Sequence, residues 1–267
     1  MSAEREQYRR EGWVRFGWDR ATDAWARAAA PVAARICADP TLHPRDLRCG
    51  GTWFVGANTL PNGPDGAVAG VPLAGPAVAF ATGALGLPPF AWDRGQVSVI
   101  HPGYPRHGAE ETPAAFAWRR DRDGAHVDGI MRQGPQRRRR VAETHLFVLG
   151  VPLTDPAPGA SPMVVWPGSH LVMQAALKHA LSGVPPADWP KVDVTDAYQA
   201  ARRRCLETLP RLVLPARAGE SYLIHRLAVH GVAPWTAGDD APSRPVAYFR
   251  PAPPQGMAAD WWLSSVG

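Results

Sequence analysis

Short β-prone runs recur between turn signals along the chain after residue 95. Each run is rich in Val, Ile, Leu, Tyr or Phe, and Gly, Pro, Asp or Ser residues separate the runs, as in antiparallel strands joined by turns. No alternation of strands and helices of the βαβ kind is visible, so a sandwich or barrel is expected. The predicted strands are 96–101, 145–153, 162–166, 211–214, 221–225 and 245–249.

Helical composition is expected before the strands and once among them. Residues from about 1 to 45 place aromatic and aliphatic side chains at loosely helical spacing, and 171–209 interrupts the strand series with a mostly helical composition. The Gly- and Pro-rich stretch 50–76 predicts a long loop, and a short helix is expected at 77–87.

The size of the chain, 267 residues, fits one all-β domain with helical additions. We therefore expect a single domain over 1–267, mainly β, with its core at about 96–250. No stretch approaches the roughly 20 apolar residues of a membrane span, and no secretory signal is visible at the N-terminus, which predicts a cytoplasmic protein. The three cysteines are irregularly spaced and are expected to be reduced. Although the net charge is +5, most arginines are scattered, so nucleic-acid binding is not expected.

A metal site is indicated by the segment GAHVDG, which holds His126 and Asp128. Residues two apart in a strand point to the same face, so an imidazole and a carboxylate can bind one ion there. About a hundred residues later, an apolar strand ends near two further histidines, His225 and His230. One of these can complete a set of two histidines and one carboxylate, which leaves open positions on an octahedral metal and is typical of non-haem iron(II) oxygenases.

Arg244 lies fourteen positions after His230, at the head of a predicted strand. Its guanidinium can form a two-point contact with a carboxylate, which fits the distal carboxylate of 2-oxoglutarate better than lysine does. A solvated surface arginine is the alternative, and the metal-binding pattern upstream favours the functional interpretation.

The order and spacing of these segments resemble the phytanoyl-CoA dioxygenase family of iron and 2-oxoglutarate oxygenases. The matching segments are HVD at 126–128, VVWPGSH at 164–170, GESYLIHRLAVHG at 219–231 and SRPVAYF at 243–249. The resemblance implies a double-stranded β-helix, or cupin-like jelly roll, with Fe(II) near one open end. It implies that His230, in a His-Gly pair, is the second histidine ligand and that His225 is a neighbour. Glu220 departs from the aspartate usual in the family.

The function expected from these residues is oxidation of a small organic substrate by O2, with Fe(II) held by His126, Asp128 and His230 and with 2-oxoglutarate as co-substrate. Hydroxylation of an unactivated C–H bond, with release of succinate and CO2, is the commonest outcome that the resemblance implies. Two alternatives stay open. One is a non-catalytic jelly-roll protein that binds a small ligand, and the other is a cupin-like metal enzyme that does not use 2-oxoglutarate.

The substrate side of the site is less marked in the sequence. Among the 11 tryptophans, Trp53 and Trp118 are the candidates for lining the substrate pocket. The arginines at 137–140 either draw an anionic substrate to the mouth or form a solvated loop. The substrate, the oligomeric state and a covering role of the 51–75 loop stay open. The remaining isolated histidines are expected to be structural: His101, His107, His145 and His170. Of these, His101 or His145 is expected inside the barrel, next to the co-substrate.

Overall fold

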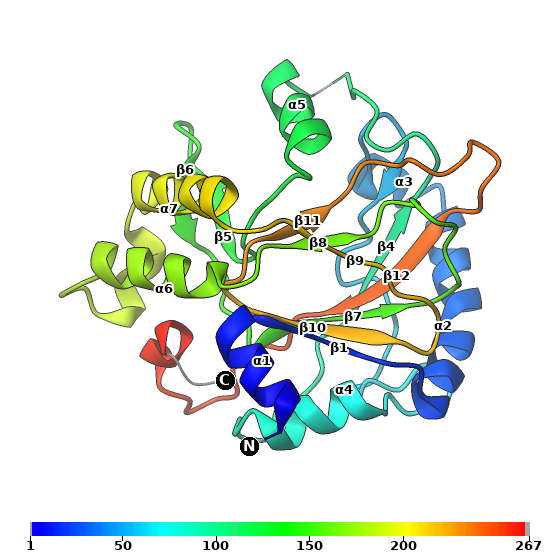
Figure 1. Cartoon of the computed structure of the whole chain (residues 1–267), viewed down its shortest axis with the longest axis horizontal. Helices are drawn as coiled ribbons and strands as arrows, with labels where there is room; N and C mark the ends of the chain where they lie inside the picture. The colour runs from blue at the N-terminus through cyan, green and yellow to red at the C-terminus, as the bar shows by residue number, and fades with distance from the viewer. Residues whose placement is uncertain (1, 110, 265–267) are drawn as a thin grey trace.

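The computed structural model describes residues 2–109 and 111–264. Two antiparallel sheets face each other at its centre, and helices surround them (Figure 1). The larger sheet has seven strands in the order β1-β10-β7-β12-β4-β3-β2, and the smaller has three in the order β11-β8-β9. The expected mainly antiparallel, jelly-roll architecture is confirmed, although the two sheets do not close into a barrel.

The strands are short, as the turn-bounded runs predict. In the larger sheet they are β1 (Trp13–Phe16), β10 (Ser221–His225), β7 (Phe147–Pro152), β12 (Arg244–Phe249), β4 (Gln96–Ile100), β3 (Trp53–Phe54) and β2 (Leu47–Arg48). In the smaller sheet they are β11 (His230–Val232), β8 (Met163–Val165) and β9 (Leu212–Leu214), and a separate hairpin joins β5 (Ile130–Gln133) to β6 (Arg138–Val141).

Burial on both faces explains why the central strands read as continuous apolar runs. Along β7, Val148 packs into the core between the two sheets, whereas Phe147, Leu149 and Val151 pack into the core under the N-terminal helices. Helix α2 (Arg20–Ala38) covers that outer face with Trp25 and a row of alanines. Successive side chains of a strand point to opposite faces, so a strand covered on both sides has no polar positions to alternate.

The predicted insertion consists of α6 (Ser169–Ala180), η2 (Pro186–Lys191) and α7 (Thr195–Thr208). These helices share a third core with η3 (Ala259–Leu263) near the C-terminus and with Val127 and Val229. Val127 and Val229 each lie one residue from a histidine of the predicted metal site, so the insertion packs directly behind that site.

The other helices are α1 (Ala3–Glu11), α3 (His43–Asp46), α4 (Pro76–Ala79) and α5 (Pro113–Asp121). The helix expected at 77–87 is α4 followed by a π-helical turn, Phe80–Ala84. Among the described residues, no helix is long and apolar enough to cross a membrane.

Candidate metal centre

His126 and His230 face each other across a single antiparallel bridge. The backbone N–H of His126 donates to the carbonyl of His230 at 2.9 Å, and the reverse bond measures 3.0 Å. His230 begins β11, but His126 belongs to no named strand and Asp128 lies in a turn after it. The prediction of a strand through HVD is therefore wrong beyond His126, since only this bridge forms. The bridge still brings together the side chains of His126 and His230, which lie about a hundred positions apart in the sequence.

The side chains of His126, Asp128 and His230 converge on one point. Nε2 of His126 lies 3.1 Å from Oδ1 of Asp128, and Nε2 of His230 lies 3.5 Å from Oδ2. One ligand atom from each of the three residues lies within 4.8 Å of the other two. Three donor atoms at this spacing are able to hold one metal ion.

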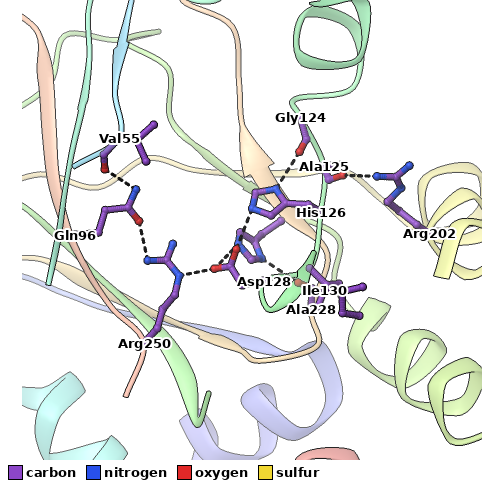
Figure 2. Close-up of polar contacts among 12 residues, drawn as sticks. Val55, Gln96, Gly124, Ala125, His126, Asp128, Ile130, Arg202, Ala228 and Arg250 are labelled. Carbon is purple, nitrogen blue, oxygen red and sulfur yellow. Dashed lines mark hydrogen bonds and ion pairs between the residues drawn. The ribbon is translucent and has the colours of Figure 1, made fainter. Parts of the chain in front are cut away.

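Both imidazoles are oriented through their second ring nitrogen. Nδ1 of His126 contacts the carbonyl of Gly124 at 2.9 Å, and Nδ1 of His230 contacts the carbonyl of Ala228 at 3.0 Å (Figure 2). A carbonyl only accepts, so each Nδ1 carries the proton and each Nε2 has a free lone pair. The lone pairs of both rings are thus directed at the Asp128 side, as metal-binding histidines require.

Asp128 is tied to Arg250 in the same cluster. Nε of Arg250 donates to Oδ2 of Asp128 at 2.5 Å, and Nη1 of Arg250 donates to Oε1 of Gln96 at 2.7 Å (Figure 2). Burial raises the pKa of Asp128, but the positive charge of Arg250 is the largest of the effects that lower it, and the pKa lies well below its ordinary value. The carboxylate is therefore ionised without a metal.

A cavity of about 440 Å³ opens on these three residues. Trp53 lines it, as the sequence predicts, with its indole N–H donating to Ser98 at 3.0 Å and the Arg119 guanidinium 5.4 Å from its ring centroid. Trp118 does not line this cavity. It lies under the guanidinium of Arg202 at 4.1 Å in a separate surface depression, so the structure does not bring it together with Trp53.

His145 is a further wall residue of this cavity. It is buried, its Nε2 has no hydrogen-bond partner among the described residues, and burial lowers its pKa to about 4. The expectation that one of the isolated histidines lies inside the fold beside the site fits His145. The expectation of a structural histidine with its polar atoms satisfied fails for Nε2.

Among the histidines outside the cavity, three are held by contacts within the fold. Nδ1 of His225 accepts from the backbone N–H of Leu227 at 3.1 Å, and its ring packs on His170 at 4.8 Å. His170 is in the first turn of α6, where Nε2 contacts the carbonyl of Arg9 at 3.0 Å. Nδ1 of His101 lies 2.7 Å from the hydroxyl of Ser243. These contacts are structural.

Arg244 is buried and lies at the start of β12. Its guanidinium lies near the hydroxyls of Tyr222 and Tyr248, which are 2.9 Å apart, and no ion pair joins it to a carboxylate of the described residues. It borders a larger cavity of about 810 Å³, whereas Tyr248 lines the cavity of the histidines. Tyr248 is therefore a neighbour both of Arg244 and of the metal-binding cavity.

The arginine run at 137–140 belongs to the turn and second strand of the β5–β6 hairpin. Arg138 pairs with Asp193 at 2.5 Å, Arg139 covers the ring of Tyr198 at 4.5 Å, and Arg140 donates to the carbonyl of Lys191. These contacts fasten the hairpin to the helical insertion. The structure thus gives these three arginines a structural role.

Two residues of the site were not predicted, Arg250 and Tyr198. Arg250 directly follows β12 and lies six residues after Arg244. Alternate residues of a strand point to the same face, so the sequence already indicated that Arg250 faces the interior as Arg244 does. The hydroxyl of Tyr198 on α7 accepts from the backbone N–H of Val127 at 3.2 Å, between the two ligand candidates His126 and Asp128. No local signal marks Tyr198, because its contact depends on how the insertion packs.

Comparisons with solved structures agree with this fold. AviO1 from Streptomyces viridochromogenes Tue57 matches with a TM-score of 0.54 and 18% identity over 95% of each chain. The non-heme alpha ketoglutarate dependent carbocyclase SnoK, from nogalamycin biosynthesis, matches with a TM-score of 0.52 and 16% identity over 100% of this chain and 91% of that one. At these identities the likeness establishes the fold. The sequence matches no protein-family model and no curated protein.

Proposed function

We propose that this chain is a non-haem Fe(II) and 2-oxoglutarate-dependent oxygenase of the phytanoyl-CoA dioxygenase type. One observation carries the proposal: two imidazole Nε2 atoms and one ionised carboxylate meet within 4.8 Å in the wall of a cavity. The ligands are His126, Asp128 and His230.

The donor set suits iron(II) in an open site. Two imidazoles and one carboxylate on one face of an octahedral ion leave three positions for other ligands. A closed structural zinc site has four protein ligands, and no fourth His, Cys, Asp or Glu joins this group among the residues described. The orientation of both rings by backbone carbonyls and the ionised state of Asp128 mean that the site needs little rearrangement to bind the ion.

The burial of Arg244 supports an anionic co-substrate. Burying a guanidinium costs several kcal/mol unless a partner offsets the lost hydration, and among the described residues no carboxylate pairs with Arg244, whose polar neighbours include the neutral hydroxyls of Tyr222 and Tyr248. A dicarboxylate such as 2-oxoglutarate supplies the missing negative charge. Tyr248 contacts Arg244 and also lines the metal cavity, so its hydroxyl marks the point where a co-substrate reaching from the metal meets the guanidinium.

Iron held by these residues would, with 2-oxoglutarate and O2, supply the oxidant that hydroxylates an unactivated C–H bond; one oxygen atom of O2 would enter the substrate and the other the succinate, with release of CO2. The protein orients the reactants and excludes water. Trp53 contributes an aromatic wall for a small organic substrate, and Arg119 above it is paired with Glu111 at 2.7 Å. Hydroxylation is the outcome we propose, although SnoK shows that a protein of this fold carries out carbocyclisation.

Succinate release tests the proposal without knowledge of the substrate. Purified protein is incubated with Fe(II), ascorbate, 2-oxoglutarate and air, and succinate is quantified against an enzyme-free blank. We expect slow, iron-dependent succinate formation that H126A and D128A abolish. Iron binding without any succinate would favour the cupin-like metal enzyme, and the absence of iron binding would favour the non-catalytic ligand-binding protein.

A further inference from the structure

Arg250 lies within a row of hydrogen bonds that ends at the proposed iron ligand Asp128. Its backbone N–H donates to Oδ1 of Asp93 at 2.8 Å, which fixes the main chain just after β12. Its Nη1 donates to Oε1 of Gln96 at 2.7 Å, and Nε2 of Gln96 donates to the carbonyl of Val55 at 2.8 Å. Figure 2 shows the row running from Val55 through Gln96 and Arg250 to Asp128. The guanidinium therefore has a fixed position and a fixed plane.

The two carboxylate oxygens of Asp128 have different surroundings. Oδ2 accepts from Nε of Arg250 at 2.5 Å and lies 3.5 Å from Nε2 of His230, whereas Oδ1 lies 3.1 Å from Nε2 of His126 and has no contact with Arg250. A carboxylate with one oxygen held by a fixed charged donor loses the freedom to rotate both oxygens toward an ion. Oδ1 is thus the oxygen that remains for a metal.

We propose that Arg250 is a positioning residue that restricts Asp128 to a one-oxygen contact with the metal and so keeps a coordination position open. This inference rests on the proposed function. A carboxylate bound through both oxygens takes one of the three positions that a bidentate 2-oxo acid and dioxygen need. Arg250 prevents this, because its Nε holds Oδ2 of Asp128 while its Nη1 is held by Gln96.

Arginine suits this role better than lysine. The planar guanidinium donates to Asp128 and to Gln96 at once from different nitrogens, whereas an ammonium is a flexible point charge. Gln96 contributes by keeping the guanidinium plane in place. It is a buried residue of β4, so this support belongs to the rigid sheet.

The test compares R250Q, R250K and Q96L with a matched control, R211Q. Arg211 forms a two-point pair with the carboxylate of Asp123, 2.7 Å at each contact, and the Asp123 side chain is 6% exposed. The control therefore breaks a pair between an arginine and a buried aspartate whose carboxylate is not a proposed ligand. Metal-free proteins are titrated with Co(II) by calorimetry and by visible absorption, and urea unfolding is recorded for each.

R250Q is expected to weaken Co(II) binding by about 10- to 100-fold, the usual effect of removing a group that orients a ligand, and to change the Co(II) absorption spectrum because the coordination number changes. R250K is expected to recover part of the affinity, and Q96L to lose less than R250Q. R211Q is expected to bind Co(II) as the wild type does, whatever its loss of stability.

Two results would overturn the inference: R250Q with wild-type affinity and spectrum, or R211Q with an affinity loss equal to that of R250Q. Addition of 2-oxoglutarate to the iron-loaded wild type distinguishes a failure of the Arg250 inference from a failure of the proposed function. If iron binds but the 2-oxo acid does not chelate it, the proposed function fails while the Co(II) comparison still judges Arg250. If the wild type binds neither metal, both fail.

Discussion

Removal of one hydroxyl, in Tyr198→Phe, is expected to loosen the proposed metal site from behind. The hydroxyl accepts from the backbone N–H of Val127, which lies between His126 and Asp128 and is buried. Phenylalanine keeps the ring, and with it the stacking of Arg139 at 4.5 Å. The variant therefore isolates the hydrogen bond.

The magnitude follows from the state in which the donor is left. A buried N–H without an acceptor costs about 1–3 kcal/mol, so the free energy of unfolding of Y198F is expected to fall by that amount. Because Val127 is the residue between the two ligand candidates His126 and Asp128, a shift of its backbone moves both, and metal affinity is expected to fall by about tenfold or more. Urea unfolding and Co(II) calorimetry measure the two effects.

Tyr8→Phe is the matched control. Tyr8 is also fully buried, but its hydroxyl has no hydrogen-bond partner among the described residues, so Y8F is expected to be neutral or stabilising. The reasoning is refuted if Y198F loses no more stability than Y8F, or if it loses stability with no change in metal affinity.

Variants of two further buried residues, Arg244 and His145, test their roles at the site. Arg244→Leu is expected to raise the 2-oxoglutarate concentration needed for half-maximal succinate formation by about tenfold or more, with Arg244→Lys between the two; equal values in R244L and wild type would contradict the anchor role. For His145, the folded pKa of about 4 lies below the unfolded value of about 6.5, so the unfolded chain takes up a proton first and metal-free stability falls as the pH drops through that window. H145Q is expected to remove about 2 kcal/mol of the loss between about pH 7 and pH 5, and identical urea-unfolding losses in H145Q and wild type would contradict it.

The long strands were predictable because their two-sided burial leaves a continuous apolar signal. Strands β4, β7 and β10 coincide with predicted runs to within two residues. The strands β2 and β3 have only two residues each, too few for any period to show, and they form because β4 provides an edge for pairing. Tertiary context decides such elements.

The same division applies to the site. The convergence of His126 and Asp128 with one of two later histidines was predictable from residue types and spacing, whereas the choice of His230 over His225 came from the family resemblance. The place of Trp118 was not, because it depends on α7, whose Arg202 covers the indole. Nor did the sequence indicate that a tyrosine pair lies beside Arg244, since that arrangement depends on the register of β10 and β12 on either side of β7.

The central claim is that the three residues bind iron(II) and that the iron binds 2-oxoglutarate. Anaerobic titration of the metal-free protein with Fe(II) and then 2-oxoglutarate tests it directly, by the weak visible charge-transfer band of a chelated 2-oxo acid. We predict that the band appears in the wild type, is absent in H126A, and requires much more 2-oxoglutarate in R244L. Iron binding without a band in the wild type would contradict the account.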